Sequence, residues 1–192
     1  MQGEGLVELT PRRGARVREM GSEEVRDLLE LLGGIEALAG ELACARATAA
    51  DIEEIRAQHA VMLEHYERNE MLAYFKRNES IHDLIVAATG NAELIRTHAL
   101  LRQRALRARY IPNARPERWR AAVQEHEAFV AALEARDGAR LGRLLRRHMK
   151  NTWQELERWL EASPEAIDHP GDPPGATRRQ SVPHPERREA GT

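Results

Sequence analysis

The chain has 192 residues, with 29 Lys and Arg against 31 Asp and Glu, which gives a formal net charge of −2 at pH 7. This length suits one ordinary domain with a core, and the charge gives no electrostatic argument for nucleic-acid binding. A single cysteine, Cys44, excludes a disulfide framework and a CxxC zinc site. No run approaches the roughly 18 apolar residues of a membrane span, and the N-terminus lacks an apolar signal-peptide core. We therefore expect a cytoplasmic protein without a membrane partner.

The first 20 residues carry the only strand-like pattern. Residues 5–9 alternate loosely, residues 11–14 (PRRG) are typical of a turn, and residues 15–17 can return as a second strand. An isolated two-stranded hairpin is marginal in water, so this segment is expected to need a partner. Arg12 and Arg13 stand at its predicted tip, where they could contact phosphate groups.

Between residues 21 and 162 the apolar residues recur with the period of an α-helix, which predicts six amphipathic helices. In chain order they are expected at residues 22–44, 48–66, about 70–89, 91–110, 116–133 and 137–159. Ser22 and Asn91 are the expected N-caps of the first and fourth helices, and Thr48 with Asp51 is typical of a capping box. Six helices joined by short links favour an all-α antiparallel bundle.

Two segments interrupt this pattern. The pair Gly33-Gly34 lies inside the first helix and weakens it by about 1 kcal/mol per glycine. Residues 111–116 (IPNARP) are expected to form a loop that breaks the chain before the fifth helix. Residues 163–192 hold six of the nine prolines and almost nothing to bury, so we expect a disordered tail.

Histidine is the most informative residue type. Five of the eight histidines, each on a different helix, are expected to project toward the core: His59, His82, His98, His126 and His148. A single buried histidine is usually a hydrogen-bonded core residue. Five of them need many partners, because an unsatisfied buried polar group is costly. A metal ion satisfies several at once.

Helical spacing indicates which residues could meet. Asn78 and His82 are four residues apart, so they share one face of the third helix. With His126 and His148 they offer three imidazole nitrogens and one amide oxygen, a set that suits Zn²⁺, Ni²⁺ or Mn²⁺ with open positions left over. Spacing alone does not favour these histidines over His59 and His98.

Other functions remain open at this point. Glu79-Ser-Ile-His82 matches the Glu-x-x-His motif of di-iron bundles, but that fold needs two such motifs and two further glutamates. A three-histidine hydrolase would need a general base, for which Glu79 and Glu125 are the neighbours in sequence. A metal-free helical dimerisation module is the third possibility. Cys44 stands among small residues and is interpreted as packing.

The fourth helix carries four arginines within eight residues: Arg102, Arg104, Arg107 and Arg109. In an arginine-rich chain such a cluster is most simply a solvated face. An inward arginine could instead bind a carboxylate through two parallel hydrogen bonds. Arg102 is the best placed by spacing, one turn beyond His98.

Several motifs together resemble a known family. They are YFKRNESIH at 74–82, ATGN at 88–91, EHE at 125–127, AALEARD at 131–137 and RHM at 147–149. Over about residues 21–162 the chain resembles the FCD effector-binding domain in the FadR-like branch of GntR-type transcription regulators. Residues 4–17 (EGLVELTPRRGARV) resemble the wing hairpin that ends the winged-helix head of those regulators.

The resemblance implies an all-helical domain that dimerises and binds an effector, with a divalent metal inside the bundle. The family motif is Asp-x-x-x-His on one helix and one histidine on each of two later helices. By position, the metal ligands are then Asn78, His82, His126 and His148. The family's effectors are typically small organic acids that bind at or beside the metal and alter operator affinity, which makes Arg102 and His98 the expected effector contacts.

The sequence departs from the family pattern at three places. Asn78 stands where an aspartate is common, which removes a negative charge from the expected site. Gly33 stands where many members carry an arginine. No helix-turn-helix precedes the predicted wing, so operator DNA is an expected partner only if that head is present in a longer polypeptide, and Arg12 and Arg13 are then a remnant of the DNA contact.

Overall fold

The computed structural model describes residues 7–10, 14–17, 20–113 and 116–162. Six helices make up nearly all of this part of the chain: α1 (Ser22–Arg46), α2 (Ala49–Glu67), α3 (Met71–Ala87), α4 (Ala92–Asn113), α5 (Pro116–Glu134) and α6 (Gly138–Ala162). Two short strands precede them, β1 (Val7–Thr10) and β2 (Gly14–Val17), which pair antiparallel with Val7 opposite Val17. The predicted all-helical bundle is confirmed.

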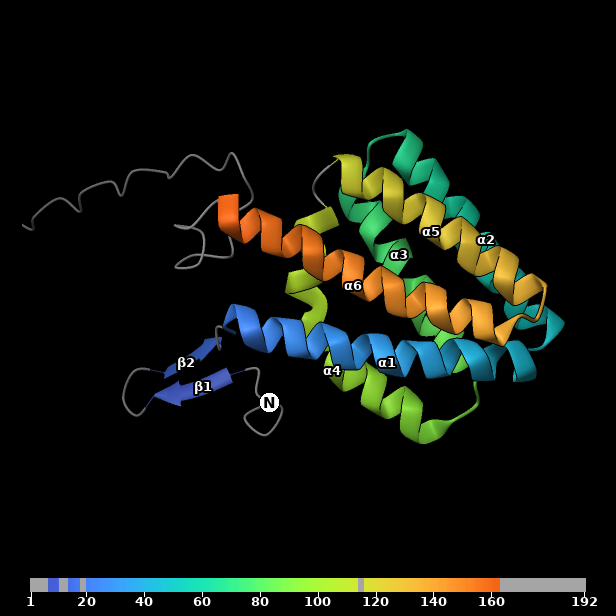
Figure 1. Ribbon diagram of the computed structural model, residues 1–192, viewed down its shortest axis with the longest axis horizontal. Coiled ribbons are helices and arrows are strands. Elements are labelled where there is room, and N and C mark those ends of the chain that lie inside the picture. The colour runs from blue at the N-terminus through green and yellow to red at the C-terminus, as the bar shows by residue number, and fades with distance from the viewer. Residues whose placement is uncertain (1–6, 11–13, 18–19, 114–115, 163–192) are drawn as a thin grey trace, which may run out of the picture.

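The two longest helices, α1 and α6, run side by side in opposite directions along one face of the bundle (Figure 1). Glycines allow this close approach. A Cβ added at Gly33 would lie 3.1 Å from Cβ of Met149, and one at Gly142 would lie 2.9 Å from the backbone oxygen of Ala37. Helix α1 is continuous through Gly33 and Gly34. Packing of Gly33 against α6 offsets the weak helix propensity of that glycine, whereas a Cβ added at Gly34 would meet no described atom within 4 Å.

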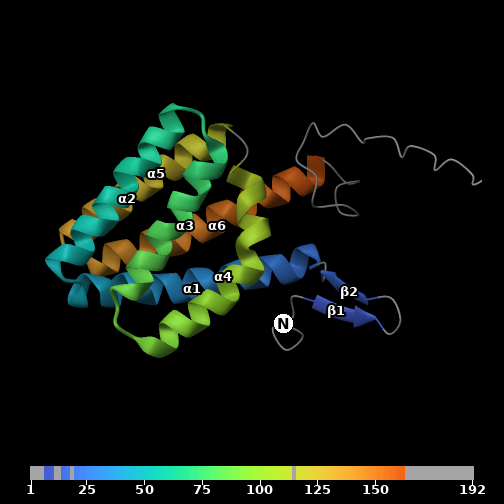
Figure 2. The same cartoon turned by 180° about the vertical axis from the view of Figure 1, so that it is seen from behind.

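Helix α3 lies inside the bundle and contacts α1, α2 and α4 (Figure 2). The largest group of buried apolar residues joins α3 to α2, α5 and α6, and includes Ile55, Tyr74, Ile81, Phe129 and Leu145. A second group fills the space between α1, α4 and the C-terminal half of α6. Polar residues of α3 are thereby held in an apolar surrounding.

The helix ends agree with the sequence in part. Thr48 and Asp51 form the predicted capping box, and Asn91 accepts hydrogen bonds from the backbone of α4. The prediction for Ser22 was wrong, since Gly21 is the cap residue and makes no side-chain bond. The prediction of a loop from residue 111 was wrong for residues 111–113, which belong to α4.

Some predictions fall outside the described residues. They concern Arg12 and Arg13 at the hairpin tip and the Pro-rich segment 163–192. None of the helices in the described ranges is both long and apolar enough to cross a bilayer.

Candidate metal centre

His82 of α3, His126 of α5 and His148 of α6 converge in the core and are defined here as the histidine cluster. One nitrogen of each ring lies within 4.8 Å of one nitrogen of the others, and the ring centroids are 5.0–5.2 Å apart. All three residues are at most 1% exposed. The structure thus brings together the three histidines that helical spacing alone did not single out.

Asn78 completes the group, one helical turn before His82. Its amide nitrogen lies 3.0 Å from Nε2 of His126, and its Oδ1 has no hydrogen-bond partner among the described residues. Turning the amide by 180° would exchange the two atoms and bring Oδ1 toward the cluster, at the cost of the contact between the amide nitrogen and Nε2 of His126.

Carboxylates stand behind two of the rings. Oε2 of Glu36 lies 2.9 Å from Nδ1 of His82, and Oε2 of Glu125 lies 2.5 Å from Nδ1 of His148. Arg118 donates to Glu125 at 2.8 Å and to the hydroxyl of Thr152 at 3.2 Å. A carboxylate that accepts from Nδ1 fixes the tautomer in which Nε2 carries a lone pair, which is how metal-binding histidines are oriented in proteins.

The electrostatics favour the neutral form of His126 and His148. Burial lowers the pKa of His126 well below its ordinary value, and the charges of His82 and His148 lower it further. Burial also lowers the pKa of His148 to about 4, although its hydrogen bond with Glu125 acts in the opposite direction. Burial alone would raise the pKa of Glu125, but the hydrogen bond and charge of His148, together with Arg118, bring it to about 2. Neutral imidazole is the form that binds metal.

The donor set therefore fits a divalent ion. Nε2 of His82 and Nδ1 of His126 are buried without a hydrogen-bond partner in the described part of the chain, as is Oδ1 of Asn78. Buried polar atoms normally have a hydrogen-bond partner, so three such atoms without one, on neighbouring side chains, indicate a missing ligand. Imidazole nitrogens with one oxygen are the ligands preferred by Zn²⁺ and Ni²⁺, and Mn²⁺ also accepts them.

His98, an expected effector contact, lies outside the histidine cluster and is linked to it through Glu36. Its Nε2 lies 3.2 Å from Oε1 of Glu36, and its Nδ1 lies 3.8 Å from Asp83. Glu36 thus contacts one histidine of α3 and one of α4. Burial alone would raise the pKa of Glu36, but the charge of His82 and the hydrogen bonds from His82 and His98, with the charge of Arg109, hold it well below its ordinary value.

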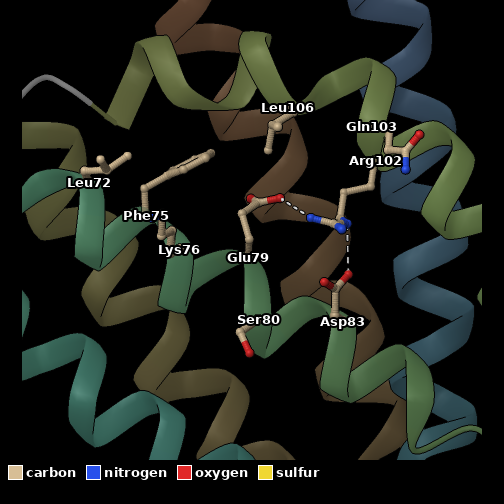
Figure 3. Close-up of a pocket in the computed structure, with 9 residues that line it drawn as sticks. All are labelled: Leu72, Phe75, Lys76, Glu79, Ser80, Asp83, Arg102, Gln103 and Leu106. Carbon is tan, nitrogen blue, oxygen red and sulfur yellow. Dashed lines mark hydrogen bonds and ion pairs between the residues drawn. The ribbon is translucent and has the colours of Figure 1, made fainter.

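The arginines of α4 are placed differently from expectation. Arg109, interpreted as part of a solvated face, is 1% exposed and is the largest fully buried side chain in the described ranges. Its Nη2 lies 3.1 Å from Oε1 of Glu79, and its Nη1 lies 3.9 Å from Glu36. Arg102 is partly exposed and lines a cavity between α3 and α4 instead of contacting the histidine cluster (Figure 3).

His59 and Cys44 lie outside the histidine cluster. His59 of α2 is buried, and burial lowers its pKa, but it is not part of the histidine cluster. Cys44 packs against α5 with its Sγ 3.8 Å from the backbone oxygen of Ala132, and burial raises its pKa, as expected for a packing residue.

Sequence reasoning missed Glu36, Arg109 and Arg118. Glu36 and Arg109 have a recognisable pattern in hindsight. Glu36 follows the buried Leu32 by four residues, and Arg109 follows the buried Ala105 by four, so both occupy apolar stripes of their helices. A charged residue on an apolar stripe indicates a buried partner, whereas Arg118 precedes the stripe of α5 and shows no such pattern.

Residues 27–151 match the FCD domain. The chain belongs to this family of GntR-type transcription regulators. Two curated relatives are transcription regulators as well. The chain is 29% identical over 154 residues to the HTH-type transcriptional repressor GlaR of Escherichia coli (strain K12), covering 76% of this chain and 70% of that protein. It is 31% identical over 129 residues to the Nta operon transcriptional regulator of Aminobacter aminovorans, covering 66% of this chain and 57% of the relative's length.

Solved structures show the same fold. E. coli McbR/YncC superposes with a TM-score of 0.73 at 18% identity, over 82% of this chain and 76% of that one. A structure titled "Lar controls the expression of the Listeria monocytogenes agr system and mediates virulence" gives a TM-score of 0.66 at 12% identity, over 82% and 75% of the two chains. Because the FCD family and these relatives are regulators, the hydrolase alternative is set aside and the chain is not an enzyme.

Proposed function

We propose that this FCD domain senses a small organic acid for a transcription regulator in the cytoplasm, and that it holds one divalent metal ion at the histidine cluster and Asn78. The observation that carries the proposal is the convergence of three buried imidazoles, two of which have a ring nitrogen without a partner in the described ranges. Zn²⁺, Ni²⁺ and Mn²⁺ are the candidate ions, since the ligand set is three nitrogens and one neutral oxygen.

The surrounding residues have distinct roles in this proposal. Glu36 and Glu125 orient His82 and His148. A bound divalent ion supplies a Lewis acid that attracts a carboxylate oxygen of the effector. Glu36 also contacts His98 of α4, so a change at His82 reaches α1 and α4 together. The effector alters DNA binding only if its affinity differs between two arrangements of these helices.

Metal content tests the proposal directly. Elemental analysis of tag-free protein should find about one divalent ion per chain, and the double variant His126→Ala/His148→Ala should lose it. His65→Ala is the matched control, because His65 lies on α2, pairs with Glu70 and is outside the cluster. A thermal-shift screen of organic acids on the metal-loaded protein then seeks the effector. If no ion binds after incubation with Zn²⁺, Ni²⁺ and Mn²⁺, and melting is insensitive to chelator, the domain is a metal-free dimerisation module.

We also propose that the domain forms a homodimer through α1. Leu31 and Leu38 are 54% and 47% exposed and lie on one helical stripe with Ile35 and Leu42, which pack against the core. Exposed leucines in a row are typical of a protein–protein contact. Sedimentation should therefore show a monomer for Leu31→Asp/Leu38→Asp and a dimer for the control Leu72→Asp on α3. A dimer in both variants would place the contact elsewhere.

Operator DNA is proposed as a partner only when a winged-helix head is attached. The antiparallel pairing of β1 with β2 supports the interpretation of this hairpin as a wing remnant. A polypeptide in which a winged-helix head precedes this domain should bind operator DNA, whereas residues 21–162 alone should not.

A further inference from the structure

A cavity of about 620 Å³ lies between α3 and α4, on the side of α3 that carries Glu79 and Asp83 (Figure 3). This volume falls within the roughly 300–1,000 Å³ that is common for small-molecule sites. One end is mainly apolar and is formed by Leu72, Phe75 and Leu106, with Lys76 beside Phe75. The other end holds Arg102 between Glu79 and Asp83, so the cavity is amphipathic along its length.

The guanidinium of Arg102 is only weakly engaged by its described neighbours. Its Nη1 reaches Oε2 of Glu79 only at 3.5 Å, the outer limit of a hydrogen bond. Its Nε lies 2.9 Å from Oδ1 of Asp83 but makes no hydrogen bond with any described residue, because the angle is poor. A guanidinium carries five N–H groups in a planar fork that matches a carboxylate. None of its described neighbours accepts two parallel hydrogen bonds from the guanidinium of Arg102.

The two acidic neighbours of Arg102 differ in how firmly they are held. Glu79 is buried and is held from behind by Arg109, at 3.1 Å and 3.3 Å. The side chain of Asp83 is 43% exposed, and its other neighbour, His98, is 3.8 Å away. Asp83 can turn into solvent at little cost, whereas Glu79 cannot. An incoming carboxylate therefore competes with Asp83 for Arg102.

We infer that this cavity is a second ligand site, distinct from the histidine cluster, which takes a monocarboxylic acid with an unbranched apolar body. The carboxylate binds Arg102 in place of Asp83, and the apolar body lies over Phe75 toward Leu72 and Leu106. The site communicates with the histidine cluster through a chain of contacts from Glu79 to Arg109 to Glu36. It needs no metal ion to bind its ligand.

Calorimetric titration of the full chain with butanoate, hexanoate and octanoate tests the inference. We expect affinity to rise with chain length, by up to roughly fourfold for each methylene that becomes buried. Octanoate should still bind chelator-treated protein, since none of its contacts is a proposed metal ligand. Arg102→Gln should weaken octanoate binding at least tenfold, since the charged half of the contact is lost. The matched control is Arg96→Gln, another α4 arginine that is exposed and pairs with Glu93.

A second variant guards against simple misfolding. Asp83→Asn removes the competing carboxylate and should tighten octanoate binding severalfold, a gain that a damaged fold does not produce. Tighter binding of octylamine than of octanoate would assign the cavity to cations and overturn the inference. So would octanoate binding that disappears in His126→Ala/His148→Ala and persists in Arg102→Gln, because the acid would then sit at the metal. A dimer that dissociates on Leu106→Asp would make this face a subunit contact and also overturn it.

Discussion

Replacing Glu36 with glutamine should destabilise the metal-free domain by about 2–4 kcal/mol. The carboxylate is 1% exposed and accepts from His82 at 2.9 Å and from His98 at 3.2 Å. Glutamine keeps the shape but has one acceptor oxygen, so its amide nitrogen must face the second ring N–H. A buried donor left unpaired costs roughly 1–3 kcal/mol, and the change of the other bond from charged to neutral costs about 1 kcal/mol more.

The same variant should bind metal about 10- to 100-fold more weakly, since loss of a carboxylate behind a metal-bound histidine typically has that effect. Urea unfolding with chelator present measures the first quantity, and competition with a chromophoric chelator for Zn²⁺ measures the second. Glu30→Gln, exposed on the same helix, is the control. Unfolding free energies within about 0.5 kcal/mol of each other, with Zn²⁺ affinities within twofold, would refute the role given to Glu36.

Three further outcomes are expected. Asn78→Asp should tighten Zn²⁺ binding, because it adds a negative charge beside the cluster, and equal affinities in a competition titration would contradict this. The same variant should destabilise the chelator-treated protein, because the new charge is then buried without a partner. Gly142→Ala should lower the unfolding free energy measured in urea by about 1–3 kcal/mol, since its Cβ would meet a backbone oxygen of α1 at 2.9 Å. Gly34→Ala, with no described atom within 4 Å of the new Cβ, should raise it by up to about 1 kcal/mol. Burial lowers the pKa of His126 and His148, so the folded state binds fewer protons than the unfolded state. The unfolding free energy of metal-free protein should therefore fall as the pH drops from 6.5 toward 4. An unfolding free energy that does not change over this pH range would contradict the prediction.

The sequence predicted the elements well because their causes are local. Helical periodicity and the Thr48–Asp51 capping box depend on residues within one or two turns of each other. The four-residue spacing of Asn78 and His82 likewise fixes a shared face. The choice of His126 and His148 over His59 and His98 came from the family resemblance, because spacing within a helix does not determine which helices face each other.

Partners across the core could not be predicted in the same way. Arg102 and Arg109 differ by seven residues and lie on nearly the same stripe of α4, so the pattern treats them alike. Their environments differ because Glu79 and Glu36 meet Arg109 deep in the bundle, whereas the cavity leaves Arg102 partly exposed. That distinction depends on where α4 crosses α3 and α1, which is a property of tertiary packing.

Several charged residues are buried between α1, α3 and α4, and their role needs an explanation other than stability. Glu36, Glu79 and Arg109 are nearly inaccessible to solvent, and a buried ion pair is often no more stabilising than apolar residues of the same volume. Stability alone therefore does not account for them. Each of these charged groups contacts more than one partner across the core: Glu36 contacts His82 and Arg109, and Glu79 contacts Arg102 and Arg109. A movement of one charged group therefore changes the ion pairs of the others, which apolar side chains do not do. Glu36 of α1 contacts both His82 of α3 and His98 of α4, and α1 also carries the exposed leucines of the proposed dimer contact. We therefore expect metal binding at the histidine cluster to change the stability of the dimer.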